Sequence, residues 1–433
     1  MPDISVKPTA ARWWLRLGIA LTGLSAVAVM ATPSVADGPK PPPDGARAQF
    51  AYVGNLIGGT ISVIDTATNT VTTTLNTGST DAVAATPDGA RLYTTSLVSD
   101  LVRVIDTATN TVLTTVPVGD APEGVAITPD GDRAYVTNSR DNNVSVIDTA
   151  TNTVTTTIGV GGLPIGVAIT PDGTRAYVAN VGGGVSVIDI ATNTVTTTIP
   201  ISAADAPFGV AIKPDGTRAY VANVGSDSVS VVDTATNTVL TTVGVGDRPQ
   251  NVAFTPNGAR AYVTNQNSDN VSVIDTTTNT VLTTIAAGDG PFGVAITPNG
   301  ARAYVTNENS DNVSVVDTAT NTVLTTVGVG NGPRGVAIVS PPSSGPKGKV
   351  VSKKPVNVYE EPTRKSEVTG SLSPKQVVTI ECKANEKDDD RALGGGDDGI
   401  WYRLAEEPRG WVESKYVKVL DHVRVPSCPD QTA

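Results

Sequence analysis

The sequence predicts an all-β fold: a seven-bladed β-propeller with four strands in each blade, followed by a smaller β domain. One phrase, Val-Ile/Val-Asp-Thr-x-Thr-Asn-Thr-Val or a one-residue variant of it, occurs seven times. Its aspartates recur every 41 to 44 residues, a period typical of four-stranded propeller blades. No segment shows the 3.6-residue apolar period of an amphipathic helix. The repeated aspartates are Asp65, Asp106, Asp148, Asp189, Asp233, Asp275 and Asp317.

Each repeat unit reads as four strands joined by turns. In one example, GVAI at 209–212 is apolar on both faces and predicts a buried inner strand. A PDG turn follows, and RAYVAN at 218–223 alternates as a second strand should. VSVVD at 229–233 predicts the third strand, and the Thr-rich TVLTTV at 238–243 predicts a half-exposed outer strand.

The two ends of the repeat region predict how the ring closes. The region starts at Ala51 with AYVGN, a second strand, and ends at Ile338 with GPRGVAI, a first strand. We therefore expect the strand at 335–338 to complete the blade that begins at Ala51, so that one blade is split between the two ends. This closure removes two free sheet edges, which would otherwise favour aggregation.

The repeat region, about 51–339, resembles the YVTN-repeat β-propeller family. The motif that names this family stands as AYVTN at 134–138, 261–265 and 303–307, and the second blade departs from it with LYTTS at 92–96. The resemblance implies a secreted or surface protein from a family in which most members have no known activity.

The composition limits the chemistry that the chain can carry out. Its formal net charge of −11 disfavours electrostatic binding of nucleic acid or anionic lipid. It has two cysteines and a single histidine, His422, so the repeat region contains neither residue type. We therefore predict no catalytic residue, no metal site, no cofactor and no enzymatic activity. Calcium stays open as an alternative, because NSDN at 267–270 and 309–312 offers oxygen ligands.

The first 36 residues read as a secretory signal peptide. Lys7, Arg12 and Arg16 precede the apolar run LGIALTGLSAVAVM, which is shorter than the roughly 20 residues that a membrane span needs. Ser34 and Ala36 form a small-x-small site that predicts cleavage after Ala36. We expect a secreted or extracellular protein whose mature chain has no transmembrane anchor. Association with the cell wall is a further alternative.

The repeats predict one uniform face and one variable face. The PDG and DTATNT turns are nearly constant, and their Asp and Asn side chains suit turn formation. The loops between second and third strands, and those between blades, differ from blade to blade and emerge together on the opposite face. On this face, the position just before the inner-strand glycine or its equivalent should surround the channel mouth. This mouth ring consists of Asp81, Glu123, Ile165, Phe208, Gln250, Phe292 and Arg334.

The mouth ring is the predicted binding site for a protein partner or small ligand. The alternative is that the aromatic side chains of Phe208 and Phe292 merely plug the channel. The main functional prediction is a non-catalytic binding or scaffold protein of the bacterial cell envelope. The alternative is a propeller enzyme of lactonase or lyase type, for which the mouth ring provides only part of a polar pocket. Nucleic acid is disfavoured as a partner, because residues 37–340 hold 13 basic and 26 acidic side chains.

A second domain is predicted after the Pro/Ser/Gly-rich linker at 340–349, where the composition changes. Residues 341–433 hold 15 basic and 15 acidic side chains. VNV at 356–358, WYRL at 401–404 and GWV at 410–412 resemble a bacterial SH3-like domain, which implies a small SH3-like β-barrel. The resemblance also implies contact with cell-wall peptide or polysaccharide.

Some features of this domain stay open. Tyr359 stands where the family usually has Arg, and Glu360 and Glu361 replace Ser-Gly, which leaves ligand contact there in question. Trp401 and Trp411 suit either the core or a ligand platform.

An insert at 385–400 is charged and Gly-rich, as a solvated loop would be, with an acidic metal site as an alternative. Cys382 and Cys428 are the only cysteines of a chain that we expect to be exported, so a disulfide between them is predicted. The predicted organisation is a signal peptide at 1–36, an N-terminal linker at 37–50, the propeller at 51–339, a flexible linker at 340–349 and the SH3-like domain with its disulfide-tied tail at 350–433.

Overall fold

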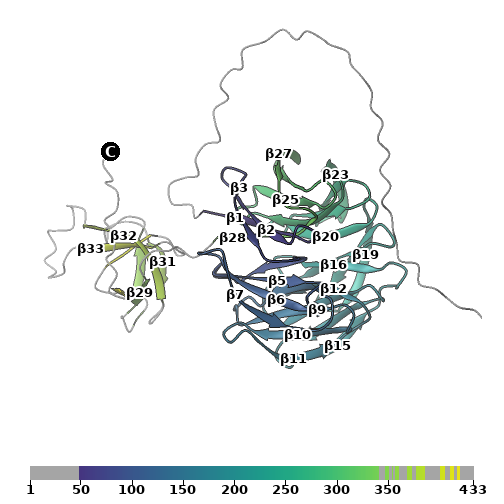
Figure 1. Ribbon diagram of the computed structural model, residues 1–433, viewed down its shortest axis with the longest axis horizontal. Coiled ribbons are helices and arrows are strands. Elements are labelled where there is room, and N and C mark those ends of the chain that lie inside the picture. Colours follow the sequence, from purple (N-terminus) through teal and green to yellow (C-terminus); the bar gives the residue numbers. More distant parts are fainter. Residues whose placement is uncertain are drawn as a thin grey trace, which may run out of the picture. The chain divides into compact units, whose positions relative to one another are not determined.

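Every regular element in the described part of the chain is a β-strand. The computed structural model describes residues 48–340 and, in the C-terminal part, 347–350, 354, 356–359, 368–372, 377–385, 400–404, 410–413 and 417–419. Seven four-stranded sheets form the propeller, and one seven-stranded sheet forms the C-terminal domain (Figure 1). The prediction of an all-β fold with seven four-stranded blades is confirmed.

Within each blade the strands are ordered inner, second, third and outer, and neighbours run antiparallel. The inner strands of blades 1 to 7 are β28 (Pro333–Val339), β4 (Val83–Ala85), β8 (Pro122–Ile127), β12 (Pro164–Ile169), β16 (Pro207–Ile212), β20 (Pro249–Phe254) and β24 (Pro291–Ile296). The second strands are β1 (Phe50–Asn55), β5 (Arg91–Ser96), β9 (Arg133–Asn138), β13 (Arg175–Asn180), β17 (Arg218–Asn223), β21 (Arg260–Asn265) and β25 (Arg302–Asn307).

The outer half of each blade begins after the variable loop. The third strands are β2 (Thr60–Asp65), β6 (Leu101–Asp106), β10 (Asn143–Asp148), β14 (Val185–Asp189), β18 (Ser228–Asp233), β22 (Asn270–Asp275) and β26 (Asn312–Asp317). The outer strands are β3 (Thr70–Asn76), β7 (Thr111–Pro117), β11 (Thr153–Gly159), β15 (Thr194–Ile199), β19 (Thr238–Gly244), β23 (Thr280–Ala286) and β27 (Thr322–Gly328).

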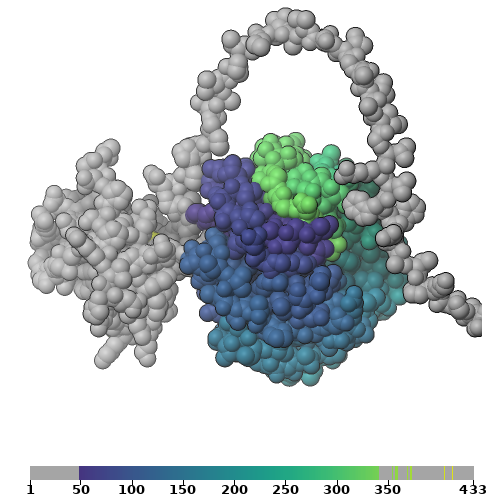
Figure 2. Space-filling view, viewed as in Figure 1, coloured from purple at the N-terminus to yellow at the C-terminus, as the bar shows by residue number. Residues whose placement is uncertain are grey.

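Blade 1 is built from both ends of the propeller. β28 pairs antiparallel with β1, which places Phe50 opposite Val339 (Figure 1). In Figure 2 the purple first residues of the propeller accordingly lie against its green last residues. Val53 and Ile64 of blade 1 share a buried apolar cluster with Tyr304 of blade 7, so the seam is packed as well as hydrogen-bonded. The predicted split-blade closure is confirmed.

A tyrosine in each second strand ties its blade to the next one. All seven tyrosines are buried, and each hydroxyl donates to the side-chain oxygen of the Asn in the DTATNT-type turn of the next blade, at 2.5 to 2.8 Å. These asparagines have φ between 54° and 57°, a left-handed conformation that Asn tolerates better than most residues. The Asn therefore forms the turn, as predicted, and also accepts a bond from the neighbouring blade.

Replacing Tyr304 by Phe is expected to lower the free energy of unfolding by about 1 kcal/mol, because it leaves the carboxamide oxygen of Asn69 without its 2.7 Å partner. A melting temperature about 2 °C lower, measured by circular dichroism, would agree with this value. Thr325→Val on the exposed outer strand is the control, since it removes a hydroxyl from a solvated site. Equal melting temperatures for Tyr304→Phe and the control would contradict this role.

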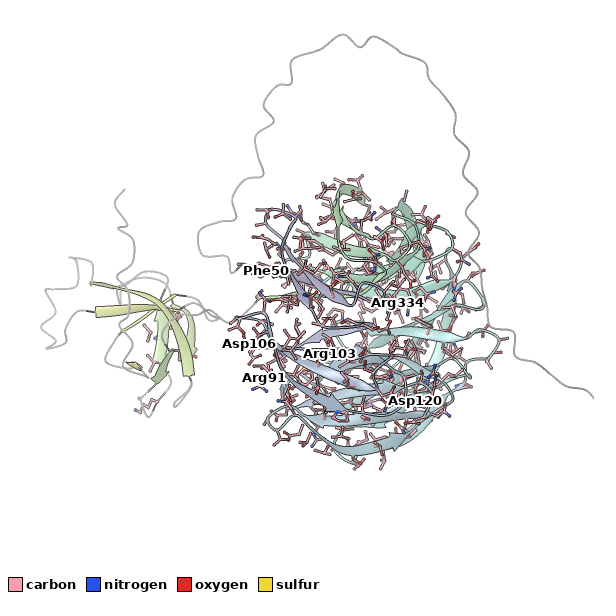
Figure 3. The ribbon with its side chains drawn as sticks, in the orientation of Figure 1. Phe50, Arg91, Arg103, Asp106, Asp120 and Arg334 are labelled. Atoms are coloured by element: carbon pink, nitrogen blue, oxygen red, sulfur yellow. The ribbon has the colours of Figure 1, made fainter. Side chains whose placement is uncertain are left out.

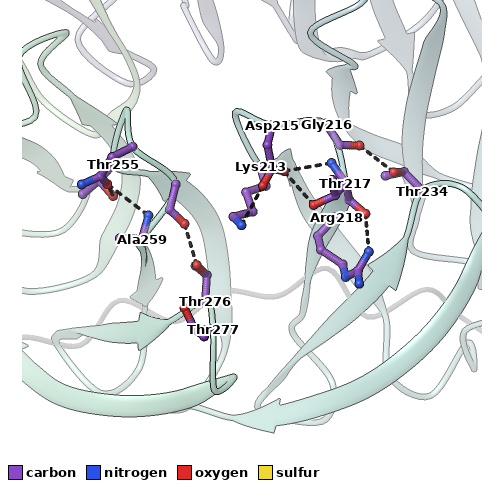
Figure 4. Close-up of polar contacts among 12 residues, drawn as sticks. Lys213, Asp215, Gly216, Thr217, Arg218, Thr234, Thr255, Ala259, Thr276 and Thr277 are labelled. Carbon is purple, nitrogen blue, oxygen red and sulfur yellow. Dashed lines mark hydrogen bonds and ion pairs between the residues drawn. The ribbon is translucent and has the colours of Figure 1, made fainter.

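The uniform and variable faces lie at opposite ends of the strands. In Figure 3, Arg91 and Asp106 beside the constant turns lie at one edge of the propeller, while Asp120 and Arg334 lie toward the other edge. Figure 4 shows constant turns: Asp215 accepts a bond from the Thr217 N–H at 2.9 Å and pairs with Lys213 at 2.8 Å. These polar groups serve their own turns.

The C-terminal domain is one sheet in the order β31-β30-β34-β33-β32-β29-β35. Its strands are β29 (Lys347–Val350), β30 (Val356–Tyr359), β31 (Val368–Leu372), β32 (Val377–Asn385), β33 (Ile400–Leu404), β34 (Gly410–Glu413) and β35 (Val417–Val419). Val356 and Val358 are buried while Asn357 between them is exposed, the alternation of a strand with one face on a core. β29 pairs with β32 and β35, although its first three residues were predicted as linker.

Several predictions fall outside the described residues. These are the signal peptide with its cleavage after Ala36, Cys428 of the predicted disulfide, Glu360 and Glu361, and most of the acidic insert. The side chains of Trp401 and Trp411 are also outside, so their role stays a prediction. The described part of the chain includes no helix with the length and apolarity of a membrane span.

Candidate functional site

Close contacts between neighbouring inner strands fix the backbone of the mouth ring. A Cβ on Gly124 would collide with the carbonyl oxygen of Ile165, so only glycine allows this approach of the two backbones. In blades 2, 3, 6 and 7 the threonine of the second strand bonds the corresponding carbonyl of the next blade. Thr137 Oγ1 donates to Ile165 O at 2.6 Å, and Thr95 Oγ1 donates to Glu123 O at 2.7 Å. The repeated motif thus holds variable side chains at fixed places.

A pocket of about 180 Å³ lies at the channel mouth. Its outermost layer contains five of the seven predicted residues. Below it lie the glycine position of each blade and then a ring of inner-strand valines. The lining residues from the predicted ring are Asp81, Glu123, Ile165, Phe208 and Phe292. Because equivalent positions of successive blades repeat around one axis, residues about 42 apart in sequence become neighbours in space.

Gln250 and Arg334 were predicted as members of the mouth ring, but they do not line this pocket. Partners on the variable loops hold their side chains elsewhere. Gln250 is buried and donates to Gln266 Oε1 at 2.9 Å. Arg334 lies between two carboxylates, with Nη1 at 2.9 Å from Asp81 Oδ1 and Nε at 2.8 Å from Glu308 Oε1. Those two charges hold the pKa of Arg334 above its usual value despite burial, so it stays cationic.

Gln266 and Glu308 belong to the site although neither was predicted as a site residue. Gln266 Nε2 donates to Glu308 Oε2 at 2.8 Å, so a bonded chain runs from Gln250 to Glu308 and through Arg334 to Asp81. Both residues directly follow the Asn that ends a second strand. At this position blades 1, 2, 4 and 5 carry Leu or Val, and only the remaining blades carry polar residues. This difference between apolar and polar residues could have identified Gln266 and Glu308 from the sequence.

The polar half of the pocket centres on two carboxyl groups. Asp81 is buried, and its Oδ1 lies 2.9 Å from Nη1 of Arg334. Burial, the charge of Asp81 and a hydrogen bond between the two carboxyls raise the pKa of Glu123 from 4.5 to about 8. The Ser139 hydroxyl and Arg334 act in the opposite direction with smaller effect. At neutral pH Glu123 therefore keeps its proton beside the pair formed by Asp81 and Arg334.

The other half of the pocket is apolar. The rings of Phe208 and Phe292 meet edge to face with centroids 6.0 Å apart and an interplanar angle of 85°. The Arg334 guanidinium lies 4.7 Å from the centroid of Phe292, a cation–π contact that holds this ring from one side. Ile165 completes the apolar wall. The rings therefore form a pocket wall and leave an open cavity beside the carboxyl pair.

The raised pKa of Glu123 predicts how stability depends on pH. The folded chain keeps this proton up to about pH 8, whereas the unfolded chain releases it near 4.5. The folded state thus binds more protons in this window, and the stability contributed by the neutral carboxyl is full below 4.5 and lost as the pH rises to 8. Glu123→Gln should remove this loss and be more stable than wild type at pH 8, by about 2 kcal/mol after allowance for solvent screening.

Urea unfolding at pH 4.5 and pH 8 would measure this effect. The free energies of unfolding of wild type and Glu123→Gln should differ more at pH 8 than at pH 4.5. A difference that does not change between the two values would contradict the raised pKa.

The NSDN segments, considered above for calcium, have another role in the structure. Asp269 Oδ1 accepts the Gly290 N–H at 3.0 Å, and Asp311 Oδ1 accepts the Gly332 N–H at 2.9 Å. Each carboxylate thus caps the following inter-blade loop. Among the residues that the structure describes, no group of three or more His, Cys, Asp or Glu is placed to hold a metal ion.

Two family models match separate parts of the chain. Residues 82–283 match the family described as lactonase, 7-bladed β-propeller. Residues 354–418 match the bacterial SH3 domain. The first match includes Glu123, Ile165, Phe208 and Gln266, whereas Asp81, Glu308 and Arg334 lie outside it. Comparison with curated protein sequences found no match.

Solved structures resemble the propeller. Hydrazine synthase from Kuenenia stuttgartiensis is 26% identical over 61% of this chain and 90% of that chain, with a TM-score of 0.56. A Bacteroides uniformis protein assigned as a 6-phosphogluconolactonase is 17% identical over 68% of this chain and 100% of its own, with a TM-score of 0.59. Its Bacteroides fragilis counterpart is 18% identical over 69% and 99%, also with 0.59.

The match to the lactonase family contradicts the prediction of a non-catalytic binding or scaffold protein and the prediction of no enzymatic activity. It favours the alternative, a lactonase-type enzyme, while the two Bacteroides structures show the shared fold. The prediction of no enzymatic activity was based on the absence of His and Cys from the propeller sequence. Acid–base chemistry by paired carboxyls with separated pKa values needs neither residue type. The chain is a seven-bladed β-propeller followed by a bacterial SH3 domain.

Proposed function

We propose that the propeller hydrolyses lactones in the channel-mouth pocket. The observation that carries this proposal is the carboxyl pair at the wall of a small pocket: Asp81, which is paired with Arg334, lies beside Glu123, whose pKa is raised to about 8. The match of residues 82–283 to the lactonase family supports the reaction type. Ring opening of a cyclic ester requires a base for water and an acid for the carbonyl oxygen, and the pair provides both.

The proposed reaction has two steps. The Asp81 carboxylate accepts a proton from water as the water oxygen adds to the lactone carbonyl carbon, and Glu123 donates its proton to the carbonyl oxygen. The ring C–O bond then breaks, the ring oxygen takes the proton from Asp81, and the new carboxyl group returns a proton to Glu123. The product is an open-chain hydroxy acid, which releases its own proton to solvent.

Arg334 and Glu308 are positioning residues in this scheme. Arg334 bonds one oxygen of Asp81 and so fixes the orientation of that carboxyl group. Glu308 binds the Nε of Arg334 and so holds the guanidinium in place. The cation remains engaged with these carboxylates, and it reaches the substrate only through Asp81 and the ring of Phe292.

A proton-release assay tests the proposal. The purified chain is mixed with δ-valerolactone or glucono-δ-lactone in weak buffer with a pH indicator, and the uncatalysed rate is subtracted. We expect turnover by wild type and its near-complete loss in Asp81→Asn. Asp120→Asn, at the rim in a 3.3 Å pair with Arg140, is the matched control and should keep its activity. No turnover of any lactone tested would rule out the proposal.

We also propose that the SH3 domain contacts cell-wall peptide or polysaccharide and that the chain is exported. The match of residues 354–418 to the bacterial SH3 domain supports the first part. Co-sedimentation with purified cell wall tests it, with the chain that ends at Ser340 as comparison. Equal sedimentation of both chains would contradict it. The finer assignment of the propeller to the YVTN-repeat family is likewise our proposal, supported by the three AYVTN copies.

A further inference from the structure

The variable face carries few positive charges, and carboxylates pair with two of its arginines. The variable loops, including the mouth ring, carry three arginines and no lysine. A fourth arginine, Arg103 of β6, reaches the loop before Asp81 and donates to the Ser79 carbonyl oxygen at 3.3 Å. Arg334 is bound to Asp81 and Glu308, and Arg140 pairs with Asp120 at 3.3 Å. A dianionic phosphate is bound in proteins by unengaged cations or clustered N–H donors.

The third arginine, Arg248, lies among acidic groups. Its side chain is exposed at the rim, two residues before Gln250. The Asp227 carboxylate accepts its main-chain N–H at 2.8 Å, and Asp247 precedes it in the chain. The same loops carry twelve Asp and Glu side chains in all, so the potential at the entrance is negative.

The pocket itself repels anions as well. Asp81 and Glu308 bring two negative charges against the single positive charge of Arg334. Glu123 adds no charge that would favour an anion at any pH, since it is either neutral or negative. The opposite wall offers Ile165, Phe208 and Phe292, whose surfaces suit carbon and C–H groups.

We infer that the substrates are uncharged lactones with a compact carbon skeleton, and that phosphorylated sugar lactones are excluded. This inference rests on the proposed hydrolysis at the same site. The lactone carbonyl faces Asp81 and Glu123 while the carbon skeleton lies against Ile165 and Phe208. A volume of about 180 Å³ leaves room for a single small ring. The assignment separates this chain from neighbours named for a phosphorylated lactone.

The test compares two substrates that differ only in the phosphate. Glucono-δ-lactone and 6-phosphoglucono-δ-lactone are assayed with the full chain by proton release at pH 7, with uncatalysed rates subtracted. We expect kcat/KM at least ten-fold higher for the neutral lactone. Raising the salt concentration should increase kcat/KM for the phosphorylated lactone, because salt screens the repulsion, and leave the neutral lactone unchanged.

Two variants sharpen the comparison. Glu308→Gln removes one negative charge beside the pocket, so the ratio of kcat/KM should move several-fold toward the phosphorylated lactone, whatever happens to each absolute rate. Arg248→Ala should leave the ratio within two-fold. A ratio that shifts ten-fold in Arg248→Ala would show that this arginine binds phosphate and would overturn the inference.

The outcomes separate the two proposals. Equal or faster hydrolysis of the phosphorylated lactone by wild type would overturn the substrate class and leave lactone hydrolysis standing. Hydrolysis of neither lactone, nor of δ-valerolactone, above the uncatalysed rate would overturn the proposed function and this inference with it.

Discussion

Glu123→Gln is expected to lower kcat/KM for lactone hydrolysis by at least about 100-fold, the usual size of a lost general acid. Gln keeps the shape of the side chain and a neutral donor beside Asp81, but it cannot transfer a proton. The loss should appear mainly in kcat, because proton donation is needed as the tetrahedral intermediate forms. Initial rates over a range of substrate concentrations measure both constants.

Two controls make this result specific. Asp120→Asn changes a carboxylate on the same face that lies in an exposed ion pair, and its kcat/KM should stay within about two-fold of wild type. Melting curves should show that Glu123→Gln is folded at the assay pH. A fully active Glu123→Gln protein would remove Glu123 from the mechanism.

Deleting β28 is expected to abolish cooperative folding of the propeller. A chain that ends at Gly332 loses the strand that pairs with β1 and the apolar residues that cover its seam with blade 7. The main-chain groups of β1 would then be left unpaired at a free sheet edge, which favours aggregation. The loss also removes Arg334, so the carboxylate of Asp81 would be left without its cation.

The matched control is a chain that ends at Ser340, which lacks the SH3 domain as well but keeps β28. We expect this control to melt in one transition and to elute as a compact species in gel filtration. The chain that ends at Gly332 should aggregate or melt without a transition. The same melting temperature for both chains would mean that β28 does not close the ring.

The fold could be predicted because its determinants are local and repeated. The spacing of Asp65 and its counterparts gives the blade length, and the alternation within RAYVAN gives a strand. The split blade followed from a region that starts with a second strand and ends with a first. One local feature was hidden: β29 begins at Lys347 within a stretch read as linker, and it forms only because β32 and β35 provide partners.

The position of the site could be predicted from the sequence, but the contacts and protonation of its side chains could be predicted only in part. The place just before the inner-strand glycine located Asp81 and Glu123, because every blade presents that position to the same axis. The directions of Gln250 and Arg334 depend on Gln266 and Glu308, which come from other loops. The proton on Glu123 depends on burial and on a charge 42 residues away, which no local pattern contains.

The pH dependence of kcat/KM for a neutral lactone, measured from pH 5 to 10 with uncatalysed rates subtracted, tests the carboxyl pair most directly. Glu123 must carry a proton to act as the acid, and its pKa is raised to about 8. We predict that kcat/KM falls as the pH rises through about 8, approaching a ten-fold decrease per pH unit. An activity that instead increases through pH 8 would show that ionised Glu123 is the active form and would contradict the assigned roles.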